Sequence, residues 1–348
     1  MELVVNIKKK LRNFTLNVNF TARDEVFALL GASGCGKSMT LKCIAGIECP
    51  DSGRIVLNGR VLFDSDNNIN LKPQKRHIGY LFQNYALFPN MTIAENIRFV
   101  ASGTADEKNA KVSENLARFS LTELGTSYPS ELSGGQQQRA AFARILAADT
   151  ELLLLDEPFS ALDSYLKWQL ELELAAVLKS YDNSALLVSH DRGEVFRLAD
   201  RIAVINKGIM EAVHTKHGLF ESPDTLAATL LSGCKNVSAA KKVAANKILA
   251  TDWGIELITA KEPGAAIKYV GIRAHFLEPQ AAKKNSDNVF LMQVDRVIED
   301  TFSYLIMVRA GDKGKLIRYE LEKSAWEKIK ADKLYLYFPP DKLMLMNR

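Results

Sequence analysis

Gly31-Ala-Ser-Gly-Cys-Gly-Lys-Ser38 has the spacing Gly-x-x-x-x-Gly-Lys-Ser of a phosphate-binding P-loop, and it predicts the core of the fold. It follows the apolar run Val26–Leu30, which is typical of a buried strand, and it precedes the helix-like segment Met39–Gly46. This order of strand, loop and helix is the context that the motif requires. The alternative, a glycine-rich turn that binds nothing, is disfavoured by the motifs farther along the chain.

The loop residues are expected to hold the phosphates of a nucleotide. Glycines let the backbone curl so that successive N–H groups point at phosphate oxygens, and the helix that follows adds its positive N-terminal end. Lys37 would contact the β- and γ-phosphates, and the hydroxyl of Ser38 would bind Mg²⁺. The predicted nucleotide-binding residues of this segment are Gly31, Ser33, Gly34, Cys35, Gly36, Lys37, Ser38 and Met39.

Composition bounds the class of protein. The 348 residues suit two domains, and 47% hydrophobic with 25% charged residues is ordinary globular composition. Four cysteines without a Cys-x-x-Cys pair form neither a disulfide framework nor a zinc site, which favours a reducing cytosol. A formal net charge of +4 is too small to argue for nucleic acid. No signal peptide or bilayer-length apolar run is seen, so a membrane role would require a partner.

Strand-like and helix-like segments alternate over the first two thirds of the chain. Val5–Lys8 and Phe14–Phe20 alternate apolar and polar residues, which predicts antiparallel strands. From Thr92 to about Leu124 the pattern is largely helical, with Thr92 and Glu95 as a capping box. Further strands are expected at Arg54–Asn58, His77–Phe82, Leu152–Leu155, Ala185–Val188 and Arg201–Ile205. Such alternation indicates a parallel, doubly wound core.

The pattern changes after about residue 230. Residues 235–348 contain short strand-like runs and little helical periodicity, which predicts a separate small β-barrel-like domain. The expected domains are therefore residues 1–230 and 231–348.

Candidate catalytic and metal-binding residues follow the P-loop at the ends of three expected strands. Leu152-Leu-Leu-Leu-Asp-Glu157 has the form of a Walker B strand, so Asp156 would support Mg²⁺ and Glu157 would polarise the attacking water. His190 follows another buried strand and could contact the γ-phosphate, while Gln83, at a third strand end, could reach both metal and water. The alternatives are a solvated acidic strand end, a structural histidine and an uninformative glutamine.

Leu132-Ser-Gly-Gly-Gln136 predicts a second anion site at the start of a helix. Its expected binding residues are Ser133, Gly134, Gly135 and Gln136. An ordinary serine-capped helix is the alternative. Because one nucleotide does not need two phosphate cradles in one chain, the motif is expected to bind ATP held by a second copy. Ser160–Asp163 would then lie along that interface, with Asp163 near the nucleotide.

In this order, the motifs resemble those of an ABC-type ATPase, the nucleotide-binding subunit of ABC transporters, over about residues 1–230. The resemblance implies an α/β P-loop domain with a parallel core sheet and an antiparallel β subdomain, ATP and Mg²⁺ as cofactors, and a head-to-tail homodimer. The family stacks an aromatic residue on adenine. Phe14 is a candidate here, but its position in an alternating strand favours a role in the core.

Finer resemblances concern the transported solute. Tyr80–Asn96 resembles the Gln-loop segment of small-solute importers, and the tail resembles a TOBE-type regulatory domain. Ser232–Asn236 and Val270–His275 look most like molybdate/tungstate importer subunits, although the Ser-Ala-Arg-Asn pattern of bacterial molybdate-binding domains is absent. This implies an ATPase at the cytoplasmic face of the membrane, with two permease subunits and an external oxyanion-binding protein. The expected regulatory oxyanion ligands are Lys235, Asn236, Arg273 and His275.

Other functions stay open at this point. The solute could instead be a sugar, a polyamine, sulfate or iron. A soluble ABC ATPase of DNA repair or translation is disfavoured because the chain has neither a long coiled-coil insertion nor a second cassette. The tail could also bind an oxyanion passively, without effect on ATP turnover.

Overall fold

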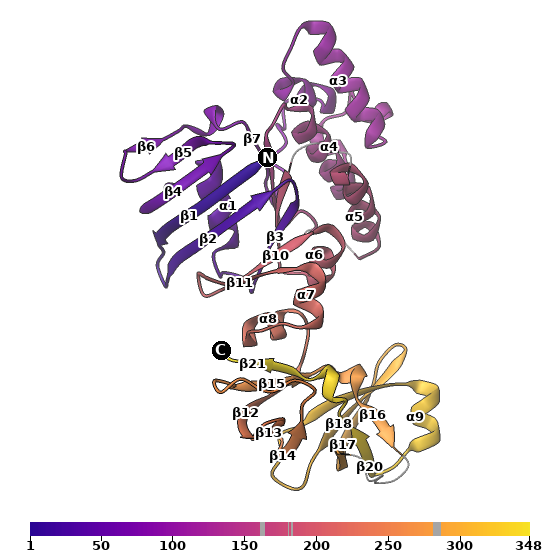
Figure 1. The fold of residues 1–348 in the computed structure, drawn as a ribbon. Helices are drawn as coiled ribbons and strands as arrows, with labels where there is room; N and C mark the ends of the chain where they lie inside the picture. The colour runs from indigo at the N-terminus through magenta and orange to yellow at the C-terminus, as the bar shows by residue number, and fades with distance from the viewer. Residues whose placement is uncertain (161–163, 180, 182–183, 281–286) are drawn as a thin grey trace. The chain divides into compact units, whose positions relative to one another are not determined.

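The computed structural model describes residues 1–160, 164–179, 181, 184–280 and 287–348, without the side chains of residues 164 and 165. Contacts within the chain define two compact units, Met1–Lys216 and His217–Arg348 (Figure 1). The division lies before the expected boundary at residue 230. Helix α8 (Leu226–Leu231) belongs to the second unit because its first backbone N–H donates to the carbonyl of Arg348 at 2.8 Å.

Eleven described strands form one mixed sheet in the first unit. Across the sheet they are β6 (Ile69–Asn70), β5 (Arg60–Asp64), β4 (Ser52–Leu57), β1 (Glu2–Lys10), β2 (Thr15–Arg23), β11 (Ile209–Thr215), β10 (Arg201–Asn206), β3 (Val26–Leu30), β9 (Ser184–Ser189), β8 (Leu152–Asp156) and β7 (Ile78–Leu81). Strands β10, β3, β9, β8 and β7 pair in parallel, whereas β1, β2, β4 and β5 pair antiparallel. The predicted α/β class, with a parallel core and an antiparallel part, is confirmed.

The apolar pattern explains the position of each part of this sheet. Strands β8 and β9 are buried along their whole length, as expected of central parallel strands covered on both faces. In β1 and β2, buried residues alternate with exposed ones, so only one face of these strands packs into the core. The segment Lys37–Ala45, which follows the P-loop, lies against the antiparallel strands, because its residues share one core cluster with those of β1 and β4 (Figure 1).

The helices of the first unit connect these strands. They are α1 (Lys37–Ala45), α2 (Ile93–Val100), α3 (Ala105–Arg118), α4 (Gly134–Ala147), α5 (Ser164–Lys179) and α6 (Arg192–Leu198). The long helical region expected after Thr92 is two helices, because Thr104 and Glu107 form a second capping box that starts α3. Within the described ranges, no helix is long and apolar enough to cross a membrane.

The second unit contains two five-stranded antiparallel sheets that share one core. The first sheet is β14 (Ile255–Ile258), β13 (Lys247–Ala250), β12 (Asn236–Ala244), β15 (Tyr269–Ile272) and β21 (Met344–Met346). The second is β16 (Glu278–Gln280), β20 (Lys333–Tyr337), β17 (Val289–Glu299), β18 (Ser303–Arg309) and β19 (Ile317–Glu322). The described helices of this region also include the short α-helices α7 (Lys216–Glu221) and α9 (Lys323–Ile329) and the 3-10 helices η4 (Ala274–Phe276) and η5 (Pro340–Lys342).

Candidate functional site

The predicted catalytic residues gather where parallel strands end. Strand β3 leads into the P-loop, β8 ends at Asp156, and β9 ends immediately before His190. In parallel sheets, the carboxyl ends of the strands are the usual place for ligand binding. The sheet order β3-β9-β8-β7 therefore brings segments that are far apart in sequence to one edge.

The P-loop has the tight backbone that its glycines predict. Gly34 and Gly36 have φ values of 77° and 107°, a region that L-residues with side chains rarely adopt. The Lys37 side chain is buried in the loop, where its Nζ donates to the carbonyls of Gly31 (2.8 Å) and Ala32 (3.0 Å). Its ammonium group is thus held inside the loop that would surround the phosphates.

The side chains of three other predicted residues of this segment differ in their exposure to solvent. Ser33 is exposed at the surface of the loop. The Cys35 thiol is buried, and burial raises its pKa, while its backbone N–H donates to the carbonyl of Ala32 at 3.3 Å. Met39 packs its side chain against the hydrophobic core.

Phe14 lies beside the P-loop and is absent from the core cluster of the described residues to which its strand pattern assigned it. A Cβ built on Gly36 would lie 3.5 Å from Cε2 of the Phe14 ring. The ring precedes β2 and is partly buried. This location, next to the phosphate loop, is where an aromatic ring could stack on a nucleotide base.

Asp156 and Ser38 form the predicted metal site. The Ser38 hydroxyl donates to Oδ1 of Asp156 at 2.7 Å, and the Tyr80 hydroxyl donates to Oδ2 at 2.8 Å. Burial, and then the Asp156 carboxylate, raise the pKa of Tyr80, so its hydroxyl stays a donor at neutral pH. A hydroxyl and a carboxylate oxygen beside a phosphate loop are hard ligands that suit Mg²⁺. Tyr80 begins the segment that resembles a Gln loop, but its contact with Asp156 was not predicted from the sequence.

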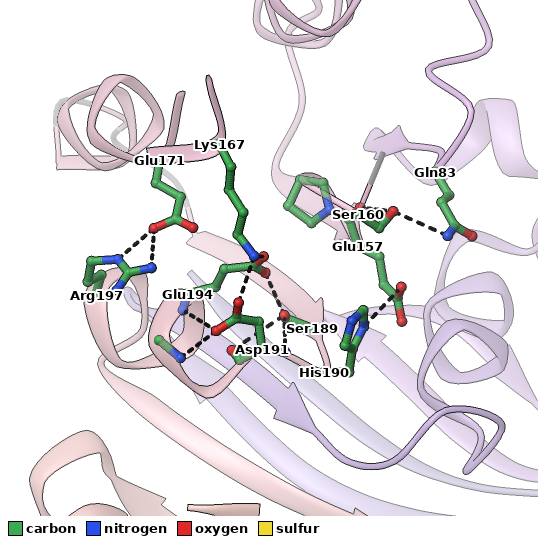
Figure 2. Close-up of polar contacts among 12 residues, drawn as sticks. Gln83, Glu157, Ser160, Lys167, Glu171, Ser189, His190, Asp191, Glu194 and Arg197 are labelled. Carbon is green, nitrogen blue, oxygen red and sulfur yellow. Dashed lines mark hydrogen bonds and ion pairs between the residues drawn. The ribbon is translucent and has the colours of Figure 1, made fainter. Parts of the chain in front are cut away.

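Glu157 is directed at His190. Oε2 of Glu157 lies 3.2 Å from Nδ1 of His190, whose side chain is 56% exposed (Figure 2). Glu157 has a φ of 47°, an unusual conformation for a residue with a side chain, and its backbone N–H donates to Val188 of the neighbouring strand at 3.0 Å. Such backbone strain is typical of functional sites, and here it places the carboxylate at the edge of the sheet.

Gln83 reaches the segment that follows Glu157. Its Nε2 donates to Oγ of Ser160 at 3.2 Å, and that hydroxyl donates to the Glu157 carbonyl at 3.1 Å (Figure 2). The three predicted catalytic residues Gln83, Glu157 and His190 are thus joined through short polar contacts. Asp163, predicted near the nucleotide of a second copy, lies outside the described residues.

Ser133 caps helix α4 as its motif predicts. Its hydroxyl accepts the N–H of Gln136 at 3.4 Å, and the Gln136 side chain accepts the N–H of Ser133 at 2.9 Å. Helix α4 packs against α2, α3, α5 and β7, whereas α1, which carries the P-loop lysine, packs against β8 and β9. The two predicted anion sites therefore begin different helices of the first unit.

The two glycines of this motif have different surroundings. A Cβ on Gly134 would meet nothing within 4 Å, whereas a Cβ on Gly135 would lie 2.4 Å from Cδ2 of Leu166 in α5. Gly135 is therefore needed for close packing of α4 on α5 within one chain. Only Gly134 faces open space, where a ligand or a second copy could approach.

The four residues predicted to bind a regulatory oxyanion have other contacts. Both polar atoms of the Asn236 side chain bond to the backbone of Arg318, with Nδ2 donating at 2.7 Å and Oδ1 accepting at 2.8 Å. Arg273 donates to the carbonyls of Phe220 (2.6 Å) and Ser232 (3.0 Å). His275 is exposed against the ring of Phe276, and Lys235 is also exposed. These contacts give Asn236 and Arg273 structural roles and do not support an oxyanion pocket.

Asn236→Ala is expected to lower the free energy of unfolding of the second unit by about 1–3 kcal/mol, because two backbone groups lose their partner. Denaturation followed by the fluorescence of Trp253 and Trp326 in a Trp168→Phe background reports on this unit, since the sequence has three tryptophans. The exposed Asn246→Ala is the control. Equal unfolding midpoints for the two variants would contradict the structural role of Asn236.

A family model described as ABC transporter matches residues 12–160. The curated Fe(3+) ions import ATP-binding protein FbpC of Haemophilus influenzae (strain 86-028NP) is 43% identical over 207 residues, which is 59% of this chain and 58% of the relative. The spermidine/putrescine import ATP-binding protein PotA of Thermotoga maritima is 39% identical over 236 residues, which is 67% of this chain and 62% of the relative. The alignments thus span less than two thirds of each curated relative.

Solved structures match the same part of the chain. The dimeric post-hydrolysis state of the ATP-binding cassette MJ0796, bound to ADP and Pi, aligns with a TM-score of 0.53 and 27% identity, covering 62% of this chain and 99% of that one. CbiO1 of Clostridium perfringens, part of the ABC transporter complex cbiONQ, aligns with a TM-score of 0.55 and 26% identity, covering 63% and 90%.

Proposed function

We propose that this chain, whose first unit has the ABC-type P-loop ATPase fold, is the ATP-hydrolysing subunit of an ABC importer. The observation that carries the proposal is that two adjacent carboxylates contact two different parts of the site. Asp156 accepts a hydrogen bond from Ser38 of the P-loop, and the next residue, Glu157, lies beside His190. A phosphate loop, a metal-binding carboxylate and a candidate base are all needed for ATP hydrolysis. Here they meet at one sheet edge.

Each group has a role that follows from its position. Lys37 and the N–H groups of the P-loop bind the β- and γ-phosphates, and Phe14 stacks on adenine. Ser38, Asp156 and Gln83 would hold Mg²⁺, which would neutralise charge on the phosphates. Glu157 accepts a proton from the attacking water, and His190 donates a hydrogen bond to the γ-phosphate.

A second copy completes each site in this proposal. Ser133 and Gly134 form the capped N-terminus of helix α4, and Gly134 has open space beside it. An N-terminal helix end with free N–H groups is suited to a phosphate. A similar solved structure is described as a dimer bound to ADP and Pi, which supports a dimer of this chain as well.

The membrane partners are proposed to dock beside the Gln83 loop. An open cleft of about 490 Å³ lies there, lined by Asn90, Met91, Glu95, Arg98, Phe99 and Lys108. Phe99 is 62% exposed, and its ring packs edge-on against Phe88 at 4.9 Å. An exposed aromatic ring with charged residues at its rim suits a short helix from another protein. Two permease subunits would hold two copies of this chain at the cytoplasmic face of the membrane.

The solute is the finer part of the proposal. Relatives described as Fe(3+) and spermidine/putrescine import proteins favour a cationic solute over molybdate or tungstate. Asn236 and Arg273 bond to backbone carbonyls, and these contacts also argue against a molybdate or tungstate site in the second unit. An external binding protein would deliver the solute, and the second unit would regulate the ATPase. Stimulation of ATP turnover in the reconstituted complex by Fe³⁺, spermidine or molybdate, each with its binding protein, distinguishes the solutes.

Isolation of the tagged chain from membranes tests the proposal. We expect a membrane protein with several spanning helices to co-purify with the wild-type chain. Phe99→Ser is expected to reduce this recovery by about tenfold or more, since a buried aromatic anchor contributes 2 kcal/mol or more to an interface. Phe302→Ser, which changes an 86% exposed ring of the second unit, is the matched control. Recovery of the wild-type chain without any membrane protein would overturn the importer assignment.

A further inference from the structure

Lys167, in helix α5, binds two carboxylates at the beginning of helix α6. Its Nζ lies 2.6 Å from Oδ2 of Asp191 and 2.5 Å from Oε1 of Glu194, and its side chain is 21% exposed (Figure 2). Burial lowers the pKa of Lys167, but its hydrogen bonds to the two carboxylates outweigh burial and raise the pKa above its ordinary value. Lys167 is therefore a charged link between two helices.

The two carboxylates belong to the turn that carries His190. Asp191 caps α6 by accepting the N–H groups of Gly193 (2.7 Å) and Glu194 (3.3 Å). Oγ of Ser189 donates to Oε2 of Glu194 at 2.5 Å and accepts the backbone N–H of Asp191 at 2.9 Å. The residues on both sides of His190 are thus fixed by the carboxylates that Lys167 binds.

Helix α5, which carries Lys167, packs against helix α4. Leu166, the neighbour of Lys167, packs so closely on α4 that a Cβ at Gly135 would lie 2.4 Å from it. A second ion pair between α5 and α6, Glu171 with Arg197, lies farther along both helices, and Glu171 also interacts electrostatically with Lys167 and Glu194. Lys167 is therefore placed to set the position of the histidine turn.

We propose that Lys167 is a positioning residue for ATP hydrolysis: through Asp191 and Glu194 it holds His190 beside Glu157, at the 3.2 Å separation of these two side chains. The role rests on the proposed ATPase function. Lys167 itself does not touch the reacting groups. Its contribution is the orientation of the imidazole, since a misplacement of about 1 Å in a catalytic group can lower a rate by 10²-fold.

Kinetics of the full chain test this role. Lys167→Met is expected to lower kcat for ATP by about 10–100-fold, with KM changed by less than about twofold, because the P-loop that binds the nucleotide is untouched. Lys167→Arg retains a cation that can bond to both carboxylates, so it should recover most of kcat. Lys111→Met, which removes another partly exposed lysine bound to a carboxylate, Asp149, is the control with kcat unchanged.

Loss of stability must be separated from loss of positioning. Lys167→Met leaves Glu194, which is 3% exposed, without its cation, whereas Lys167→Met with Glu194→Gln removes that buried charge. We expect the double variant to recover the Tm of the wild type and to keep the low kcat. Recovery of both Tm and kcat in the double variant, or a folded Lys167→Met chain with wild-type kcat, would overturn the proposal.

Hydrogen exchange gives a readout that does not depend on ATP turnover. Lys167→Met and the double variant should both exchange the amides of Gly193 and Glu194 at least about tenfold faster than the wild type, and Lys111→Met should not. Unchanged exchange would overturn the positioning role. If the wild-type chain hydrolyses no ATP while exchange responds as expected, the proposed function fails but the structural link between Lys167 and the histidine turn stands.

Discussion

Glu157→Gln is expected to lower ATP turnover by about 10²–10⁴-fold while ATP still binds, because a positioned general base is lost and no phosphate contact is removed. Glutamine preserves the size of the side chain and a hydrogen bond to His190. Its amide cannot accept a proton from water. The measurement is steady-state phosphate release by the full chain, together with the dissociation constant for ATP from equilibrium binding.

A matched control separates charge loss from base loss. Glu173→Gln neutralises a partly exposed carboxylate of the same unit, which pairs with Arg139, and should leave turnover within about twofold of the wild type. Turnover near the wild-type rate in Glu157→Gln would contradict the assignment of the base. A parallel loss of ATP binding would instead assign Glu157 to the binding of nucleotide.

Gly134→Glu, in the Glu157→Gln background, is expected to weaken ATP-dependent dimerisation by about 100-fold or more, because a carboxylate placed against the phosphates of the partner's nucleotide costs several kcal/mol. The new side chain enters open space in the free chain, so folding should be unaffected. Gly135 is unsuitable for this test, since any side chain there would collide with Leu166 of the same chain. Sedimentation with and without ATP measures the effect.

Gly264→Glu is the control for this variant, because it also adds a carboxylate at an uncrowded glycine, in the second unit. It should dimerise with ATP as the parent does. ATP binding to the P-loop of Gly134→Glu should also equal that of the parent. An undiminished dimer in Gly134→Glu would count against a nucleotide held between two copies.

Local motifs were enough to predict a candidate ATP site, and tertiary contacts were needed to find the residues around it. The apolar runs before Ser38 and Asp156 are continuous enough to mark buried parallel strands, so their ends could be placed at one edge from sequence. Phe14 was misassigned because a two-residue alternation gives the face of a strand and not the loop that packs beside it. The contacts of Tyr80 with Asp156 and of Lys167 with Asp191 and Glu194 could not be predicted, because these partners are far apart in sequence.

In the second unit, too, the contacts of polar side chains could not be predicted from the sequence. Short resemblances around Asn236 and Arg273 suggested oxyanion ligands, since amide and guanidinium groups suit that chemistry. In the structure these groups satisfy backbone atoms of β19 and of the segment near α8. A polar residue that completes the hydrogen bonds of a distant segment looks, in sequence, the same as one that binds a ligand.

The account depends most on the claim that each ATP lies between the P-loop of one chain and the Ser133 helix of another. Crosslinking measures this directly. One tagged chain carries Ser33→Cys and a second carries Ser133→Cys; both residues are exposed, and both chains carry Glu157→Gln and have the exposed Cys49 replaced by serine. With a short bifunctional maleimide, the account predicts a mixed dimer that forms with ATP and Mg²⁺ and is absent without nucleotide. Failure to form this product with ATP, or equal formation without nucleotide, would contradict the account.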